Sequence, residues 1–172
     1  EIIRPFKGGP ITTGSTFYVD STTGSDAAGR GRSAEKPVAT VDYAIGLCTS
    51  NKGDVIYVMP NHAENVNSAT AFLCDKAGIT IIGLGTGNNR PLFTATTSTG
   101  GVVVTTADVT MENLTFIASQ SGVVRMMHIK GKYCTIKNCE ILDGGAAHVE
   151  AGIEVGAANN DADGLNVTGC RI

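Results

Sequence analysis

The residues best suited to chemistry gather near position 150. Two carboxylates beside a base are the usual means of general acid–base catalysis and of metal-assisted reactions. Here four acidic or imidazole side chains follow three lysines along the chain, namely Asp143, His148, Glu150 and Glu154 after Lys130, Lys132 and Lys137. The competing interpretation, which we favour, is that all of them are solvated residues on an outer surface. No catalytic residue is therefore assigned, and the candidates are Lys137, Asp143, His148 and Glu150.

A second group of polar residues has the spacing of a calcium loop. Asn159, Asp161 and Asp163 place side-chain oxygens at alternate positions before Gly164, as in the first half of an EF-hand loop. Cys170 stands where the closing acidic residue would be, and no helical pattern precedes the loop. We therefore expect a polar turn and no metal or cofactor, with Ca²⁺ at these three residues as the alternative.

Two further polar positions lie earlier in the chain. His62 and Glu64 are two residues apart after Pro60, so on an extended segment both would face the same side. A metal site would need a third ligand, which the sequence does not identify, and a surface loop is the favoured interpretation. Arg90, in the turn sequence 88–91, would either bind a carboxylate or lie in solvent.

Repeated segments indicate what must position these residues. Four six-residue segments can be aligned, with starts at 79, 109, 134 and 165 and spacings of 30, 25 and 31 residues. Positions one, three and six are apolar in all four, and position five is Gly, Asn, Asn and Gly. A period in this range is typical of a repeat architecture. A strand, a bend and a second strand in each repeat would make one coil of a β-helix.

Stacking such coils in register would place equivalent side chains above one another. Position three would then form one inner column, and position six would form a second one. The columns are Ile81, Met111, Ile136 and Val167 for the first, and Leu84, Leu114, Cys139 and Cys170 for the second. Asn113 and Asn138 would stack at the bend. The sequence lacks the regular series of hairpin turns that a β-sandwich needs, so we predict an all-β, right-handed parallel β-helix.

One helix is expected, near the N-terminal end. Val41, Ala44, Ile45 and Cys48 recur at helical spacing, Thr40 is a suitable N-cap, and Asn51 with Gly53 ends the pattern. A helix over 40–50 could cap the open end of the stack. We therefore divide the chain into an extended arm (1–16), an opening strand with the capping helix (17–53) and the coils (54–172). Because the sequence stops two residues after the fourth aligned segment, we expect that the natural chain continues or that a partner covers that end.

Composition narrows the classes of function. The 172 residues include 22 Gly and no Trp, and the net charge is −3, which offers no general attraction to nucleic acid or to anionic membranes. No apolar stretch is long enough for a transmembrane helix. The five cysteines show no CxxC pair, so buried free thiols are favoured over a disulfide framework.

The opening region also resembles a known family. The sequence resembles the beginning of pectin-lyase-like right-handed β-helix proteins in the segments 17–20, 24–26, 36–41, 53–58, 78–85 and 134–141. The resemblance spans about residues 17–172 and implies the β-helix fold. It implies little about activity, since such folds carry many functions.

A narrower similarity involves residues 47–64, which are similar to predicted structural proteins of tailed bacteriophages that carry this β-helix. It implies a non-enzymatic structural protein, either a capsid decoration or a tail appendage, on the virion surface or outside the cell. The expected partners are further copies of the chain, in a trimer, and other virion proteins, but no nucleic acid and no membrane. The N-terminal arm would attach to the particle.

Two alternatives remain open. An extracellular lyase or hydrolase acting on acidic polysaccharide would, as the family resemblance implies, use carboxylates that bind Ca²⁺ beside a basic residue that removes a proton from the sugar. No lyase motif can be matched residue by residue. A carbohydrate-binding module without turnover, with cell-surface polysaccharide as its partner, is the other alternative.

Overall fold

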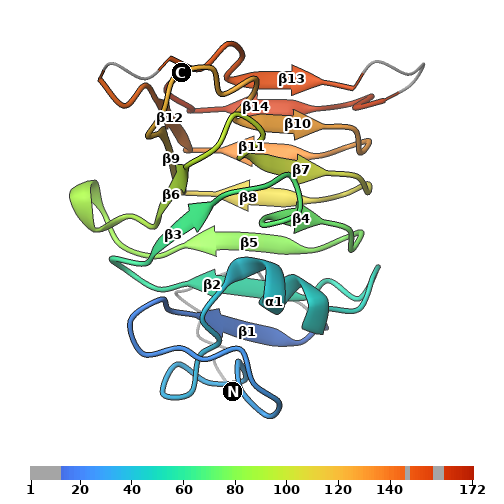
Figure 1. Ribbon diagram of the computed structural model, residues 1–172. Helices are drawn as coiled ribbons and strands as arrows, with labels where there is room; N and C mark the ends of the chain where they lie inside the picture. Colours follow the sequence, from blue (N-terminus) through green and yellow to red (C-terminus); the bar gives the residue numbers. More distant parts are fainter. Residues whose placement is uncertain (1–12, 146–147, 157–160) are drawn as a thin grey trace.

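The strands of this protein pair in parallel along three faces of a stack (Figure 1). The computed structural model describes residues 13–145, 148–156 and 161–172. Within them, sheet A contains β1 (Thr16–Val19), β2 (Val55–Val58), β5 (Thr80–Gly83), β8 (Thr110–Glu112), β11 (Thr135–Lys137) and β14 (Asn166–Thr168). Sheet B contains β3 (Ala63–Val66), β6 (Leu92–Ala95), β9 (Thr115–Ala118) and β12 (Glu140–Leu142). Sheet C contains β4 (Leu73–Cys74), β7 (Val102–Val104), β10 (Met127–Ile129) and β13 (Ile153–Val155).

From β2 onwards the chain visits the sheets in the fixed order A, B, C. Each turn of the chain therefore adds one strand to every sheet and lies directly on the turn before it. This arrangement confirms the prediction of a right-handed parallel β-helix with one short helix towards its N-terminal end. Within the described residues no helix is long and apolar enough to span a bilayer.

The first predicted inner column is present in sheet A. Ile81 pairs with Met111, Met111 with Ile136, and Ile136 with Val167. The first three side chains are fully buried, whereas Val167, in the last strand, is 42% exposed because no further coil covers it. Alternation along each strand puts the neighbouring residues on the outer face.

The prediction of the second column is confirmed at Leu114 and Cys139 and is wrong at Leu84. Leu114 and Cys139 are buried and Cys170 is partly buried, but Leu84 packs only partly. The reason is the length of the connection from sheet A to sheet B. After β8 and β11 it has two residues, whereas after β5 it has eight and includes the 3-10 helix η1 (Gly87–Asn89). Leu84 therefore does not occupy the bend position.

The two-residue bends depend on a left-handed backbone conformation. Asn113 and Asn138 have φ values of 61° and 51°, and Gly169 has 65°, a region that Asn and Gly tolerate best. The side-chain amide of Asn113 donates to the carbonyl oxygens of Gly83 (2.7 Å) and Gly85 (3.0 Å) in the preceding coil. The stacked asparagine position thus ties one coil to the next.

The helix α1 (Val41–Leu47) closes the N-terminal end of the stack against β1, β2 and β4. Thr40 is its N-cap, as predicted, and its side chain accepts a hydrogen bond from the backbone N–H of Tyr43 (3.3 Å). The apolar face expected from the sequence is buried. In addition, Asp42 accepts a hydrogen bond from the backbone N–H of Leu73 (3.1 Å), which satisfies part of the edge of sheet C that has no preceding strand.

Candidate functional site

The loop from β12 to β13 brings together two of the predicted catalytic residues. His148 Nδ1 lies 3.5 Å from Asp143 Oδ2, and both side chains are largely exposed, at 75% and 52%. The other oxygen of Asp143 accepts a hydrogen bond from the backbone N–H of Val149 (3.0 Å). The Asp143 carboxylate therefore stabilises the conformation of the loop to which it belongs. Glu150 is exposed nearby, and its backbone N–H donates to the carbonyl of Val123 (2.9 Å).

Lys137 lies on a different face of the molecule. It stands on the outer side of β11 in sheet A, where its Nζ is 3.0 Å from Oε1 of Glu112, its register partner in β8. The structure thus pairs Lys137 with Glu112 rather than with Asp143.

The predicted calcium residues are only partly placed. Asn159 lies outside the described residues. Asp161 is partly buried, and Asp163 is exposed with Oδ2 3.8 Å from Nζ of Lys132. Among the described residues, no group of three His, Cys, Asp or Glu side chains is arranged to hold a metal ion.

His62 and Glu64 form a deeply buried polar pair, and the expectation of a surface loop was wrong. The His62 ring is fully buried, with its centroid 5.4 Å from that of Phe93. Its Nδ1 accepts from the backbone N–H of Ser21 (3.0 Å), which places the proton on Nε2, 3.0 Å from Glu64 Oε2. The prediction that the two side chains face the same side is confirmed.

Glu64 occupies a position that is apolar in the later coils. Its register partner is Phe93, and the column continues through Phe116 and Ile141. Instead of meeting another coil, Glu64 meets the first turn of α1, where Oε2 accepts from the backbone N–H of Val41 (3.0 Å). A carboxylate is favourable at this end of a helix.

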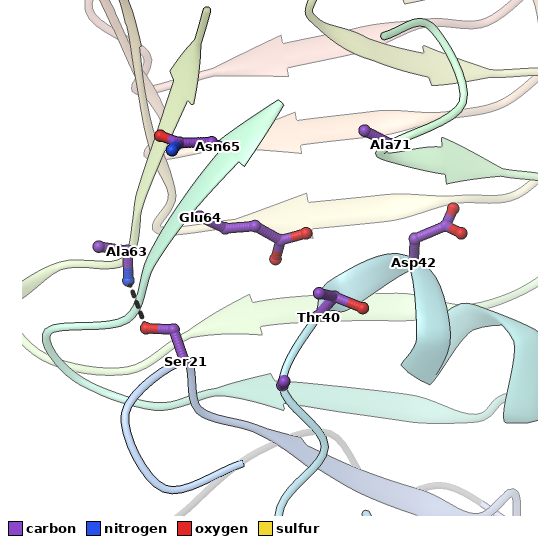
Figure 2. A pocket seen from close by; sticks show the side chains of 8 residues that line it. Ser21, Thr40, Asp42, Ala63, Glu64, Asn65 and Ala71 are labelled. Carbon is purple, nitrogen blue, oxygen red and sulfur yellow. Dashed lines mark hydrogen bonds between the residues drawn. The ribbon is translucent and has the colours of Figure 1, made fainter. Parts of the chain in front are cut away.

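An open pocket of about 490 Å³ lies beside this pair, between β3, α1 and the turn after β1. Figure 2 shows Glu64 pointing from β3 towards α1, with Thr40 and Asp42 on the opposite side and Ser21 bonded to the backbone of Ala63. Each of the two carboxylates already holds a backbone N–H. The polar side chains around the pocket therefore hold the capping helix α1 against β3 and β4.

The outer face of sheet C carries a further group of titratable residues. His128 of β10 pairs in register with Glu154 of β13, and its Nε2 lies 3.6 Å from Oε1 of Glu154. Arg125, just before β10, donates through Nη1 to both oxygens of Glu154, at 3.3 and 3.1 Å. Burial, together with the charges of Arg125 and Lys130, lowers the pKa of His128, so the ring is neutral near pH 7.

Sequence reasoning missed Arg125 and His128 for a simple reason. His128 lies inside the apolar run 126–129, whose composition is typical of a core strand and does not mark the histidine, or Arg125 just before it, as a polar site. The strand does fill the core with Met127 and Ile129, but alternation along β10 directs His128 to the opposite face, where it lies against Glu154 and is only 9% exposed. Strict alternation along this short strand could have predicted that His128 faces away from the core.

Comparisons with known proteins concern the fold. No protein-family model matches the chain, and no curated protein matches it. Among solved structures, the chain is similar to one described as rhamnogalacturonan lyase, with a TM-score of 0.58 and 17% identity over 91% of this chain. The chain spans about half of that protein, 51% of its length. At this identity the likeness shows a shared parallel β-helix fold and nothing about activity.

Proposed function

We propose that this chain is a non-enzymatic structural module of a bacteriophage particle, a stiff β-helical rod in a capsid decoration or a tail appendage. The observation that carries the proposal is that charged side chains on the outer faces pair with one another from coil to coil. Three ion pairs join side chains of successive coils, namely Glu112 with Lys137, Arg125 with Glu154, and Lys132 with Asp163.

The geometry of the backbone supports a mechanical role as well. In a parallel β-helix the hydrogen bonds between strands run along the axis of the stack. A load along this axis is therefore shared by three sheets at once, and each coil is held by contacts with its neighbours. We place this mechanical role on a virus particle because residues 47–64 are similar to predicted structural proteins of tailed bacteriophages. Assembly as a trimer beside other virion proteins is part of the proposal.

Mass spectrometry of gradient-purified particles tests the proposal. The protein should co-sediment with intact particles at a constant ratio to the major capsid protein, and gold-labelled antibody should mark the particle surface. A non-virion protein from the same lysate is the control. Sedimentation of the isolated protein tests the trimer. Presence in the lysate together with absence from purified particles would contradict the assignment.

A polysaccharide lyase is the second candidate, favoured by the cluster of Arg125, His128 and Glu154 on one outer sheet. Incubation with rhamnogalacturonan, pectate and alginate, followed by absorbance of unsaturated products, separates the two. We expect no product. Product that disappears in R125A or H128A, or in K137A or D143A, would overturn the structural role. Binding of glycans without product would indicate a carbohydrate-binding module.

A further inference from the structure

A small, partly open pocket lies beside sheet C, where the loops from sheet B enter it. Its volume is about 110 Å³. Val103 and Val124 provide apolar walls, and Arg125, His128 and Ser98 provide the polar ones, while Val102 of β7 borders the space with its side chain in the core. Ala69, on an exposed loop, borders the same space.

The size of the pocket limits what can enter. At about 110 Å³ it is far smaller than a site for a whole small molecule. Pockets for whole small-molecule ligands are typically about 300–1,000 Å³. The space suits one substituent of a larger molecule, whose remainder would stay outside the pocket.

The charges limit the chemistry of that substituent. The guanidinium of Arg125 is already compensated by Glu154, to which it donates at 3.1 and 3.3 Å. The lowered pKa of His128 leaves its ring uncharged near neutral pH. A carboxylate would therefore find no uncompensated cation, and it would lose hydration against the valines. A neutral group with one apolar end and one hydrogen-bond acceptor matches the lining.

We propose that this pocket binds the acetyl group of an acetylated ligand. The methyl group packs against the valine walls, and the carbonyl oxygen accepts a hydrogen bond from the polar wall formed by Arg125 and His128. N-acetyl amides and O-acetyl esters share this chemistry. The inference does not depend on the phage assignment, since it concerns the outer surface of the folded coils.

Chemical shifts in ¹H–¹⁵N spectra of the whole chain provide the test. The amide probes are N-acetylglucosamine and glucosamine, and the ester probes are an O-acetylated xylo-oligosaccharide and its deacetylated form. Glucuronate tests the carboxylate. Saturable shifts at Val102, Val103 and Val124 are expected with the acetylated probes, at least ten-fold weaker with the others. Comparison of the two acetylated probes distinguishes amide from ester.

Two variants control for the location. A69L fills the pocket from an exposed loop position, so it should abolish the shifts while leaving the rest of the spectrum unchanged. A27L, at an exposed position in another loop, should bind as the wild type does. Equal binding of acetylated and deacetylated probes, tighter binding of glucuronate, or no saturable shift with any probe would each overturn the proposal.

Discussion

Individual thiols differ sharply in their surroundings. Cys48, Cys74, Cys134 and Cys139 are buried, and Cys170 is only partly so. Burial raises the pKa of Cys139 to about 11 and that of Cys48 to about 12. Because the thiolate is the reactive form, both burial and protonation protect these groups. All five cysteines are free, as the sequence predicted.

Labelling with a chromogenic disulfide reagent tests this difference. We expect one thiol, Cys170, to react with the native protein within minutes at pH 8, and all five to react in concentrated urea. C170S should remove the fast reaction. Rapid labelling of two or more thiols in the native C170S protein would mean that the interior is accessible.

His128 predicts a dependence of stability on pH. Its pKa is lowered in the folded protein, whereas in the unfolded chain a histidine titrates near about 6.5. Above that value both states are neutral and stability is complete. As the pH falls below it, the unfolded chain takes up the proton first, so the free energy of unfolding declines until the folded pKa is reached.

Urea unfolding at pH 7.5 and at pH 5.5 measures this effect. The wild type should lose more stability between the two values than H128Q does. H148Q is the matched control, since His148 is 75% exposed and its removal should leave the profile nearly unchanged. Identical profiles for the wild type and H128Q would contradict the assigned direction.

Among the elements, the two-residue bends between sheets A and B depend most on one residue type. Asn113 combines a positive φ of 61° with two hydrogen bonds to the preceding coil. In N113A we expect a loss of about 1–2 kcal/mol, because alanine tolerates this backbone conformation poorly and both carbonyl groups lose a donor.

Urea unfolding of two further variants separates the contribution of the backbone conformation from that of the hydrogen bonds. N113G keeps the conformation and removes the hydrogen bonds. N61A, at an exposed residue with φ 62°, tests the conformation at a site outside the stacked bends. If N113A is as stable as the wild type, the bend does not depend on the asparagine.

The helix that closes the stack depends on its N-cap. Thr40 accepts from the N–H of Tyr43 and donates to Asp26 Oδ2 at 2.8 Å. T40A should cost about 1 kcal/mol, seen as a lower urea midpoint and as faster amide exchange in α1. T40S retains the hydroxyl and should restore most of the loss. Equal exchange rates in T40A and T40S would exclude a capping role.

At the scale of the whole molecule, one continuous interior joins all coils. Ile136 lies between Met111 and Val167 in that interior and is fully buried. I136D would bury an unpaired carboxylate and should cost about 4 kcal/mol or more, a large share of the stability of a typical domain.

V167D is the matched control for this change. It alters the same column at its exposed end, where Val167 is 42% accessible, and should change stability by only about 0.5 kcal/mol. Circular dichroism during urea unfolding compares the two. Similar unfolding midpoints for I136D and V167D would show that the column does not carry the fold.

The periodic parts of this architecture could be predicted from the sequence because the same apolar positions recur in each repeat. The column through Ile81, Met111 and Ile136 follows from alternation alone. The insertion that displaces Leu84 could not be predicted, because the aligned segment looks complete up to that residue. Local patterns describe a strand well but not the length of the connection that follows it.

The polar sites were harder to predict, for a related reason. Glu64 looked like a loop residue, because nothing in its neighbourhood reveals that a helix 23 residues earlier presents its first N–H there. His128 and Glu154 come together through the register of two coils. Such contacts depend on which residues are stacked, and this is known only once every connection has been counted.

The closed end formed by α1 and β1 has a consequence for biosynthesis. Because those elements precede the coils in the chain, they leave the ribosome earlier, and the capped end can form before the last coil has been translated. Each later coil then finds a finished template beneath it, since its partners were made about 25–30 residues earlier. Vectorial growth of this kind makes the newest coil the edge to which the next one is added.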